Sequence, residues 1–132
     1  MIRALPDTNV LISSVFWSGK PNHIIKQGIE GKYQLVTSVE MLQEFVNKMR
    51  NKFGFPEYQL YLLMDSIFTH FHIVPKISSF SVVRDPTDNK VIETAFDGQV
   101  DYIITGDPDL LDLKEFRGIK IVNPDEFLKT VG

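Results

Sequence analysis

The chain has 132 residues and 43% hydrophobic content, which is enough for one domain with a buried core. It has no cysteine, which excludes disulfides, cysteine-bound zinc and thiol nucleophiles, and no apolar run approaches the ~18 residues needed to span a bilayer. The net charge of −3 argues against indiscriminate nucleic-acid binding, which normally shows as a basic balance.

Strands and helices alternate in the first part of the sequence. The apolar run at 2–5 predicts a buried strand, and the segment after it has the apolar spacing of a short helix. A second helix should end at Gly31, because glycine readily takes the left-handed conformation of a C-terminal cap. The predicted elements are a strand at 2–5, a helix at 9–16, a break at 17–21, a helix at 22–30 and a strand at 33–36.

The same alternation continues to the C-terminus. Thr37 and Glu40 have the spacing of a capping box and predict the start of a helix. One apolar stripe is expected in each of the next two helices, formed by Leu42, Phe45, Val46 and Met49 and by Leu60, Leu63, Met64 and Ile67. The predicted elements are helices at 38–50 and 57–69, a strand at 71–74, a polar loop to about residue 87, a helix at 88–96, strands at 102–105 and 119–122, and a helix at 124–131.

This alternation predicts an α/β fold over a single domain, residues 1–132. The expected architecture is a three-layer α/β/α sandwich around a mostly parallel sheet. Ligands of such sheets bind at the carboxyl ends of the strands, near the point where the strand order reverses. Asp7 follows the first predicted strand and Asp107 follows the strand at 102–105. We therefore expect both carboxylates at one edge of the sheet.

Acidic residues at these positions also have structural interpretations. Asp107 and Asp85 each precede a proline, which is typical of a helix N-cap followed by proline at the first helical position. Asp88 suits the first turn of a helix because of the helix dipole. Glu44 can pair with Lys48 one helical turn later. Taken one at a time, these acids do not require a functional explanation.

Several carboxylates in one cleft do require one. Two carboxylates about 4 Å apart repel by roughly 4 kcal/mol at an effective dielectric constant of 20. A divalent cation offsets this repulsion, and oxygen ligands without a thiol or a histidine cluster select magnesium or manganese. A metal ion held by carboxylates typically acts on phosphate groups. The acids concerned are Asp7, Glu44, Asp88 and Asp107.

Four motifs carry a family resemblance. They are Asp7-Thr8-Asn9 after an N-terminal strand, a mid-chain Glu44, Arg84-Asp85-Pro86-Thr87-Asp88-Asn89-Lys90 leading into a helix, and Thr105-Gly106-Asp107-Pro108-Asp109 after a strand. In order and spacing they resemble the PIN-domain ribonucleases, and among these the VapC-type toxins of bacterial and archaeal toxin–antitoxin pairs. The resemblance extends over essentially the whole chain, to Asn123-Pro124-Asp125-Glu126-Phe127.

The resemblance implies a role for each acidic residue. The metal ligands and catalytic residues would be Asp7, Glu44, Asp88 and Asp107. Asn9 and Thr105 would be polar supports, and Asp109 would be an outer acidic residue. The chain departs from the family pattern at Leu110, where an aromatic residue usually follows the last acidic pair.

The reaction implied is hydrolysis of an RNA phosphodiester bond with one or two Mg²⁺ or Mn²⁺ ions. Asp7 would be the central ligand, Asp88 and Asp107 would complete the inner or water-mediated shell, and Glu44 would hold or activate water. Contacts with the RNA backbone are expected from the basic residues Lys48, Arg50, Lys52, Arg84 and Lys90.

Two protein partners follow from the same resemblance. One is an antitoxin whose C-terminal segment plugs the acidic cleft, and the other is a second copy of the chain in a homodimer. The apolar stripe on the helix at 57–69 is a candidate contact surface. No membrane partner is expected. The absence of cysteine and of a secretory leader pattern favours a cytoplasmic protein.

Two alternative functions compete with this interpretation. A haloacid-dehalogenase-like phosphatase also begins with an aspartate after an N-terminal strand, and Gly106-Asp107 with Asp112 is similar to its late acidic motif. That enzyme needs a second aspartate two residues after the nucleophile, where this chain has Asn9. A catalytically silent interaction module of the PIN fold would bind metal without turnover.

Overall fold

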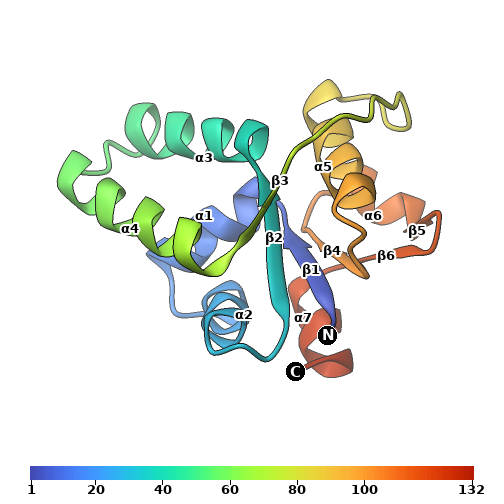
Figure 1. The fold of residues 1–132 in the computed structure, drawn as a ribbon, viewed down its shortest axis with the longest axis horizontal. Helices are drawn as coiled ribbons and strands as arrows, with labels where there is room; N and C mark the ends of the chain where they lie inside the picture. Colours follow the sequence, from blue (N-terminus) through green and yellow to red (C-terminus); the bar gives the residue numbers. More distant parts are fainter.

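The structure is a computed structural model that describes the backbone of residues 1–132 and the side chains of residues 1–86 and 88–132. Across this described backbone, the centre of the molecule is a six-stranded sheet with the strand order β3-β2-β1-β4-β6-β5. Helices cover both faces of the sheet (Figure 1). The predicted α/β/α architecture is confirmed.

The sheet is parallel except at one edge. Pairs β1–β2, β2–β3, β1–β4 and β4–β6 are parallel, whereas β5 pairs with β6 in the antiparallel direction. The parallel strands are short and mostly apolar because both faces of the sheet are buried. The strands are β1 (Arg3–Pro6), β2 (Gln34–Ser38), β3 (His72–Val74), β4 (Tyr102–Ile104), β5 (Glu115–Phe116) and β6 (Ile119–Val122).

Two apolar clusters lie on opposite faces of the sheet. One joins β1 and β2 to α1, α2, α3, α4 and α7, and the other packs α5 and α6 against the strands from the other side. The helices are α1 (Thr8–Phe16), α2 (Lys20–Ile29), α3 (Val39–Asn51), α4 (Glu57–His70), α5 (Pro86–Asp97), α6 (Pro108–Leu113) and α7 (Pro124–Thr130). Over the described part of the chain, every helix is too short or too polar to reach across a lipid bilayer.

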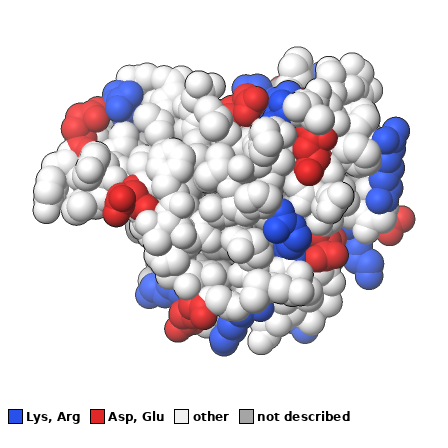
Figure 2. Space-filling model, in the orientation of Figure 1, with Lys and Arg blue, Asp and Glu red and all other residues white. Residues whose placement is uncertain are grey.

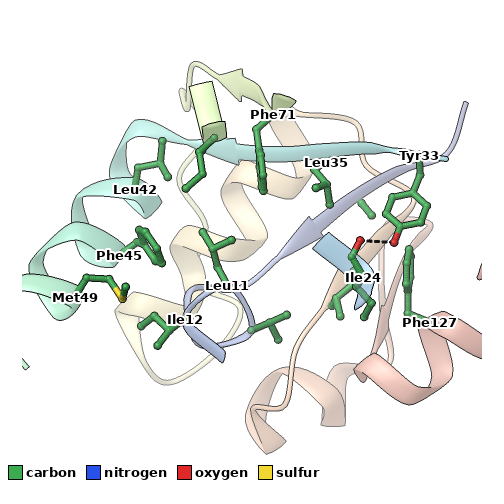
Figure 3. Packing of buried hydrophobic residues seen from close by; sticks show 14 of the residues in the cluster. Leu11, Ile12, Ile24, Tyr33, Leu35, Leu42, Phe45, Met49, Phe71 and Phe127 are labelled. Carbon is green, nitrogen blue, oxygen red and sulfur yellow. Dashed lines mark hydrogen bonds between the residues drawn. The ribbon is translucent and has the colours of Figure 1, made fainter. Parts of the chain in front are cut away.

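The larger cluster holds α1 and α3 against the sheet (Figure 3). Leu11 and Ile12 of α1 pack with Phe45 and Met49 of α3, and all four side chains are buried. Full burial of a side chain of this size stabilises the fold by about 1.5–3 kcal/mol. Tyr33 is also fully buried, and its hydroxyl donates a hydrogen bond to the carbonyl of Ile24 at 2.6 Å. This packing fixes the two helices whose first halves carry polar residues at the sheet edge.

Helix ends follow the predicted chemistry in one case and depart from it in another. Gly31 has φ +90°, and its N–H bonds the carbonyl of Gly28 at 3.0 Å, as expected for the C-terminal cap of α2. The capping box starting at Thr37 is wrong, since Thr37 lies inside β2 and is buried. The N-cap of α3 is Ser38, whose hydroxyl accepts from the N–H of Met41 at 3.3 Å.

Two short elements near the C-terminus were not among the predicted helices and strands, although the structural interpretation of Asp107 as a helix N-cap is confirmed. Helix α6 begins at Pro108 after the N-cap Asp107, whose side chain accepts from the N–H of Asp109. Strands β5 and β6 are joined by Arg117 and Gly118, with φ values of +49° and +87°. Positive φ at both central residues is the requirement of a type I′ hairpin turn. A six-residue helix and a two-residue strand are too short to produce a periodic sequence signal.

The segment 75–85, here called the strap, joins β3 to α5 without regular secondary structure. Asn89, Glu93 and Asp97 stand four residues apart on one side of α5, and their side chains accept hydrogen bonds from the strap backbone. The N–H groups bound at 2.7–3.0 Å are those of Val82 and Val83 for Asn89, of Phe80 for Glu93, and of Ile77 and Ser78 for Asp97. The strap is therefore tied along the length of α5.

Aromatic contacts hold the middle of the strap. The ring of Phe80 packs edge-on against Phe96 of α5 and Phe116 of β5, with centroid distances of 5.3 and 5.4 Å. The guanidinium carbon of Arg117 lies 5.0–5.2 Å from all three ring centroids. Such a cation–π contact at an exposed site contributes about 0.5–1 kcal/mol. The β5–β6 hairpin thus helps to fix the strap and α5.

Candidate active site

Two acidic residues leave neighbouring parallel strands at the same edge of the sheet. Pro6 of β1 lies opposite Ile104 of β4, and the N–H of Asp7 bonds the carbonyl of Ile104 at 3.0 Å. The strand order reverses here, with β2 and β3 on one side and β4 and β6 on the other. A crevice at such a reversal is the usual ligand site of open α/β sheets. The expected placement of Asp7 and Asp107 at one edge is what the structure shows.

Asp7 is a buried carboxylate with two hydrogen-bond donors. It is the N-cap of α1, and its Oδ1 accepts from the N–H of Val10 at 2.8 Å. Its Oδ2 accepts a short hydrogen bond from the hydroxyl of Thr105. Burial is the main reason that the pKa of Asp7 is raised, and the nearby Asp107 adds to this rise. The bonds from Thr105 and Val10 act in the opposite direction and favour the charged form.

Thr105 links the two acids that follow β1 and β4. Its side chain is fully buried directly after β4. While its hydroxyl donates to Asp7, the hydroxyl oxygen accepts from the backbone N–H of Asp107 at 3.0 Å. The Oδ1 of Asp107 in turn accepts from the N–H of Asp109 at 2.9 Å. One threonine thus sets the position of both carboxylates.

Asp88 brings a third acid to this edge from the first turn of α5. Its side chain is 8% exposed, and among the described residues its Oδ2 is buried without a hydrogen-bond partner. Burial, and after it the charge of Asp107, raises the pKa of Asp88 to about 7. One carboxylate oxygen each of Asp88, Asp107 and Asp109 lie within 4.8 Å of one another. These three acids form the acidic triad.

Glu44 reaches the same edge from α3 and is paired with a lysine. The Nζ of Lys48 lies 3.2 Å from Oε1 of Glu44 and donates to Oδ1 of Asn9 at 3.5 Å. Asn9 therefore contacts Lys48 and makes no hydrogen bond to a carboxylate among the described residues. Lys48 offsets part of the negative charge at this edge, and it also lowers the pKa of Asp7.

A single cavity of about 340 Å³ collects these groups. Its lining is polar and comes from α1, α3, the end of the strap, α5 and the start of α6. The lining residues are Asp7, Thr8, Asn9, Glu44, Lys48, Asp85, Asp88, Lys90, Val91 and Asp107. Five acids therefore share one cavity, four of them the predicted metal ligands and the fifth Asp85. It is here called the acidic cavity.

Comparison with known proteins identifies the family. Residues 3–109 match the model of the PIN domain. The chain belongs to the PIN domain family. It is also similar to the uncharacterized protein MJ1680 of Methanocaldococcus jannaschii, with 32% identity over 97% of this chain and 90% of the relative. PIN domains are in general nucleases, so the family assigns this chain to the hydrolases that cut nucleic-acid phosphodiester bonds.

The four predicted metal ligands lie together, but the three acids that could share one ion are a different set. Asp7, Glu44, Asp88 and Asp107 all line the acidic cavity, together with Lys48 and Lys90. The triad that could hold one ion differs from this quartet, since it contains Asp109 and neither Asp7 nor Glu44. Asp109 comes close because the first turn of α6 folds it back beside Asp88. The spacing of these residues in the sequence does not predict that Asp109 lies beside Asp88.

The basic residues predicted for RNA contacts are spread over several surfaces. Arg50 is bound to the exposed Glu57 and lines an apolar groove between α3 and α4. The Nη2 of Arg84 lies 3.8 Å from Oδ2 of Asp109. Lys52 lies over the ring of Phe53, 5.6 Å from its centroid. Sequence reasoning treated Asp85 only as a helix cap, but it also lines the acidic cavity.

The donor set of the acidic cavity fits a hard divalent cation. Its acidic ligands are all oxygen donors, which Mg²⁺ and Mn²⁺ prefer. The buried Oδ2 of Asp88 has no hydrogen-bond partner among the described residues, and the pKa of Asp88 is raised by burial first and by the neighbouring carboxylates second. A cation beside Asp88 and Asp107 would remove both penalties. PIN nucleases typically use divalent metals, and the acidic triad of this chain is consistent with that use.

Proposed function

We propose that residues 1–132 form a single PIN-like domain that acts as a metal-dependent endoribonuclease, the toxin component of a toxin–antitoxin pair. The observation that supports this function best is the shared cavity of Asp7, Glu44, Asp88 and Asp107. One carboxylate oxygen of Asp88 in this cavity is buried and has no hydrogen-bond partner among the residues whose side chains are described, which suits a cation. No second candidate function is favoured, because the position that a haloacid-dehalogenase-like phosphatase needs as an acid is the neutral Asn9.

Each side chain of the site has its own role in the proposed reaction. Asp7, Asp88 and Asp107 would hold Mg²⁺ or Mn²⁺, with Asp109 beside them. A divalent ion held there supplies a Lewis acid that lowers the pKa of water and offsets charge on the phosphate. Thr105 keeps the Asp7 carboxylate oriented, and Glu44 orients the attacking water and accepts a proton at a carboxylate oxygen. Lys48 limits the negative charge that the phosphate meets on entry.

A cleavage assay with a matched control tests the function. Purified wild type, Asp7→Asn and Asp65→Asn are incubated with structured and unstructured RNA in Mg²⁺, Mn²⁺ or chelator. Asp7→Asn keeps the shape of the N-cap but loses a charge, so we expect cleavage to fall on the order of 100-fold or more, beyond the ~10- to 100-fold of an outer-shell change. Asp65 is an exposed acid on α4, and its variant should cleave as wild type does.

Three results would contradict the proposal. Cleavage that survives chelation would exclude the metal mechanism. An unchanged rate in Asp7→Asn would remove Asp7 from it. Metal binding without RNA cleavage would indicate the silent interaction module instead.

The toxin role and the protein partners need a separate test. On α4 the predicted stripe residues Leu60 and Ile67 are buried, whereas Tyr61 and Leu62 are 73% and 50% exposed. We infer that this exposed part of α4 contacts a second copy of the chain. Sedimentation should then give a dimer for wild type and a monomer for Tyr61→Ser.

The toxin role is tested by expression in cells. Expression of wild type, but not of Asp7→Asn, should arrest growth, and a co-expressed antitoxin should relieve the arrest.

A further inference from the structure

Four aromatic side chains gather where α1 and α3 end. The ring of Phe16 lies 5.0 Å from that of Phe53, 5.7 Å from that of Phe55 and 5.7 Å from that of Trp17. Phe55 is partly buried against the core and anchors the group. Trp17 is 62% exposed, and Phe16 and Phe53 are also exposed. The cluster therefore presents a broad aromatic face to solvent, supported from below.

The same two helices lead from this cluster to the acidic cavity. Asn9 lies in the first turn of α1 and Glu44 lies on α3, and both line the cavity. Lys48 bridges them, which shows that the two helix faces adjoin there. At the other end, the Phe16–Phe53 contact joins the helices again. A continuous seam between α1 and α3 thus connects the acids to the aromatic rings.

Cations line this seam at helical spacing. The cations Lys48 and Lys52 follow the acid Glu44 at intervals of four residues, so all three lie along one face of α3 and its C-cap. The Nζ of Lys52 lies 5.6 Å above the ring of Phe53. From Glu44 to Lys52 the helix rises ~12 Å at ~1.5 Å per residue. This distance corresponds to about three or four stacked nucleotides at ~3.4 Å each.

This arrangement has the chemistry of a single-stranded nucleic-acid track. Proteins that bind single strands combine cations along the backbone path with aromatic side chains on which bases stack. On the face shown in Figure 2, acidic and basic residues are interspersed and form no single basic field. Because the protein has a net charge of −3, electrostatic attraction to the RNA phosphates alone gives only weak binding. Stacking on rings supplies binding that does not depend on net charge.

We propose that Trp17, backed by Phe16 and Phe53, is a stacking platform for a base of single-stranded RNA whose scissile phosphate lies in the acidic cavity. Lys48 and Lys52 contact the RNA phosphates that lie between the acidic cavity and Trp17. This inference rests on the proposed ribonuclease function. A protein partner on the same rings is the competing occupant, but the lysines along a seam that ends in the acidic cavity favour a phosphate-bearing chain.

The tryptophan itself provides the probe. Trp17 is the single tryptophan of the sequence, so its emission reports on this position alone. Wild-type protein in chelator is titrated with an unstructured RNA of twelve nucleotides. We expect a saturable change in Trp17 emission with the same midpoint as the anisotropy of labelled RNA.

Substitutions separate stacking from general apolar contact. Trp17→Ala and Trp17→Leu should each weaken RNA binding on the order of 10-fold, whereas Trp17→Phe keeps a ring and should bind nearly as wild type does. Phe68→Ala is the matched control, because Phe68 is 57% exposed on α4 and lies outside the seam. Circular dichroism during heating should show equal melting for all of these exposed-site variants.

RNA length gives an independent check. In Mg²⁺ or Mn²⁺, cleavage of a dinucleotide, which is too short to reach from the acidic cavity to Trp17, should be equal in wild type and Trp17→Ala. For the longer RNA, Trp17→Ala should raise KM on the order of 10-fold with kcat nearly unchanged, because a remote contact supports ground state and transition state alike.

The outcomes distinguish this inference from the proposed function. If wild type cleaves RNA but Trp17→Ala binds and cleaves the long RNA equally well, the platform is wrong and the ribonuclease stands. If Trp17→Ala changes only the oligomeric state measured by sedimentation, the rings form a protein interface and the platform is again wrong. If wild type neither binds nor cleaves RNA, both proposals fail together.

Discussion

Thr105 is the residue on which the geometry of the site depends most directly. Its hydroxyl both donates to Asp7 and accepts from the N–H of Asp107. Buried polar groups that lose their partners cost about 1–3 kcal/mol each, because the desolvation of the group is no longer offset. Removing this hydroxyl would therefore loosen two carboxylates at once.

We expect Thr105→Val to lower cleavage by about 10- to 100-fold, the usual range for a residue that orients a metal ligand. Valine keeps the shape of the buried side chain but neither donates nor accepts. Thr105→Ser, which restores the hydroxyl, is the control and should recover most of the rate. Initial rates at saturating metal measure the effect, and a wild-type rate in Thr105→Val would mean that the hydrogen bonds do not matter.

The sequence predicted which residues form the site but not which neighbours they contact. Asp7, Glu44, Asp88 and Asp107 were predicted to meet, and all four line one cavity. Asn9 was expected to support a carboxylate, yet it contacts Lys48. Which oxygen faces which neighbour depends on packing at the sheet edge, for which a single sequence gives no signal. The catalytic role of each acid stays a prediction.

Among the elements, α5 and the strap act as a unit. The amide of Asn89 forms three hydrogen bonds to the strap, two accepted from Val82 and Val83 and one donated to the carbonyl of Val83 at 3.0 Å. Asn89 directly follows Asp88 in the first half of α5. The strap therefore holds the part of the helix that brings Asp88 to the acidic cavity.

Asn89→Ala should destabilise the fold by about 1–3 kcal/mol, because the strap N–H groups lose their acceptor. For a chain of this size, this corresponds to a fall of roughly 3–10 °C in Tm. Gln59→Ala, an exposed amide on α4, is the matched control and should melt as wild type does. Calorimetry compares the two. An unchanged Tm for Asn89→Ala would show that the strap contributes nothing to the stability of α5.

The strap also marks the limit of sequence reasoning about elements. The alternating strands and helices could be predicted because their apolar residues recur with a regular period. The strap has no such period, since its order comes from side chains of another element. The same holds for β5, which depends on a tight turn and on pairing with β6. The long periodic segments and the loop at the strap were predicted, whereas the contacts that fix the strap and the strand β5 were not.

On the scale of the whole molecule, the acidic cavity couples stability to pH and metal. The pKa of Asp88 is raised from 3.8 to about 7 in the folded state. Between these values the folded state binds more protons than the unfolded state. The free energy of unfolding of the metal-free protein therefore falls as pH rises from about 4 to about 7. Metal reverses the trend, because it binds the deprotonated carboxylates of the folded state.

We expect Mn²⁺ to raise Tm more at pH 8 than at pH 6, since protons compete with the ion for Asp88 at the lower pH. Asp88→Asn should lose most of this increase and, in chelator at pH 8, should melt above wild type by a few degrees, roughly 2–5 °C. Asp65→Asn serves as control and should respond as wild type does. An equal Mn²⁺ response in wild type and Asp88→Asn would place the ion elsewhere.

The pairing of β1 with β4 has a consequence during synthesis. Asp7 and its hydrogen-bond donor Thr105 are separated by 98 positions in the chain, and every strand partner of β4 on the other side is made later still. A growing polypeptide that ends before Thr105 lacks both the hydroxyl that orients Asp7 and the last of the four predicted acids, Asp107. On the proposed function, the messenger being translated is thus safe from the product it encodes until the codons for Thr105 and Asp107 have been decoded.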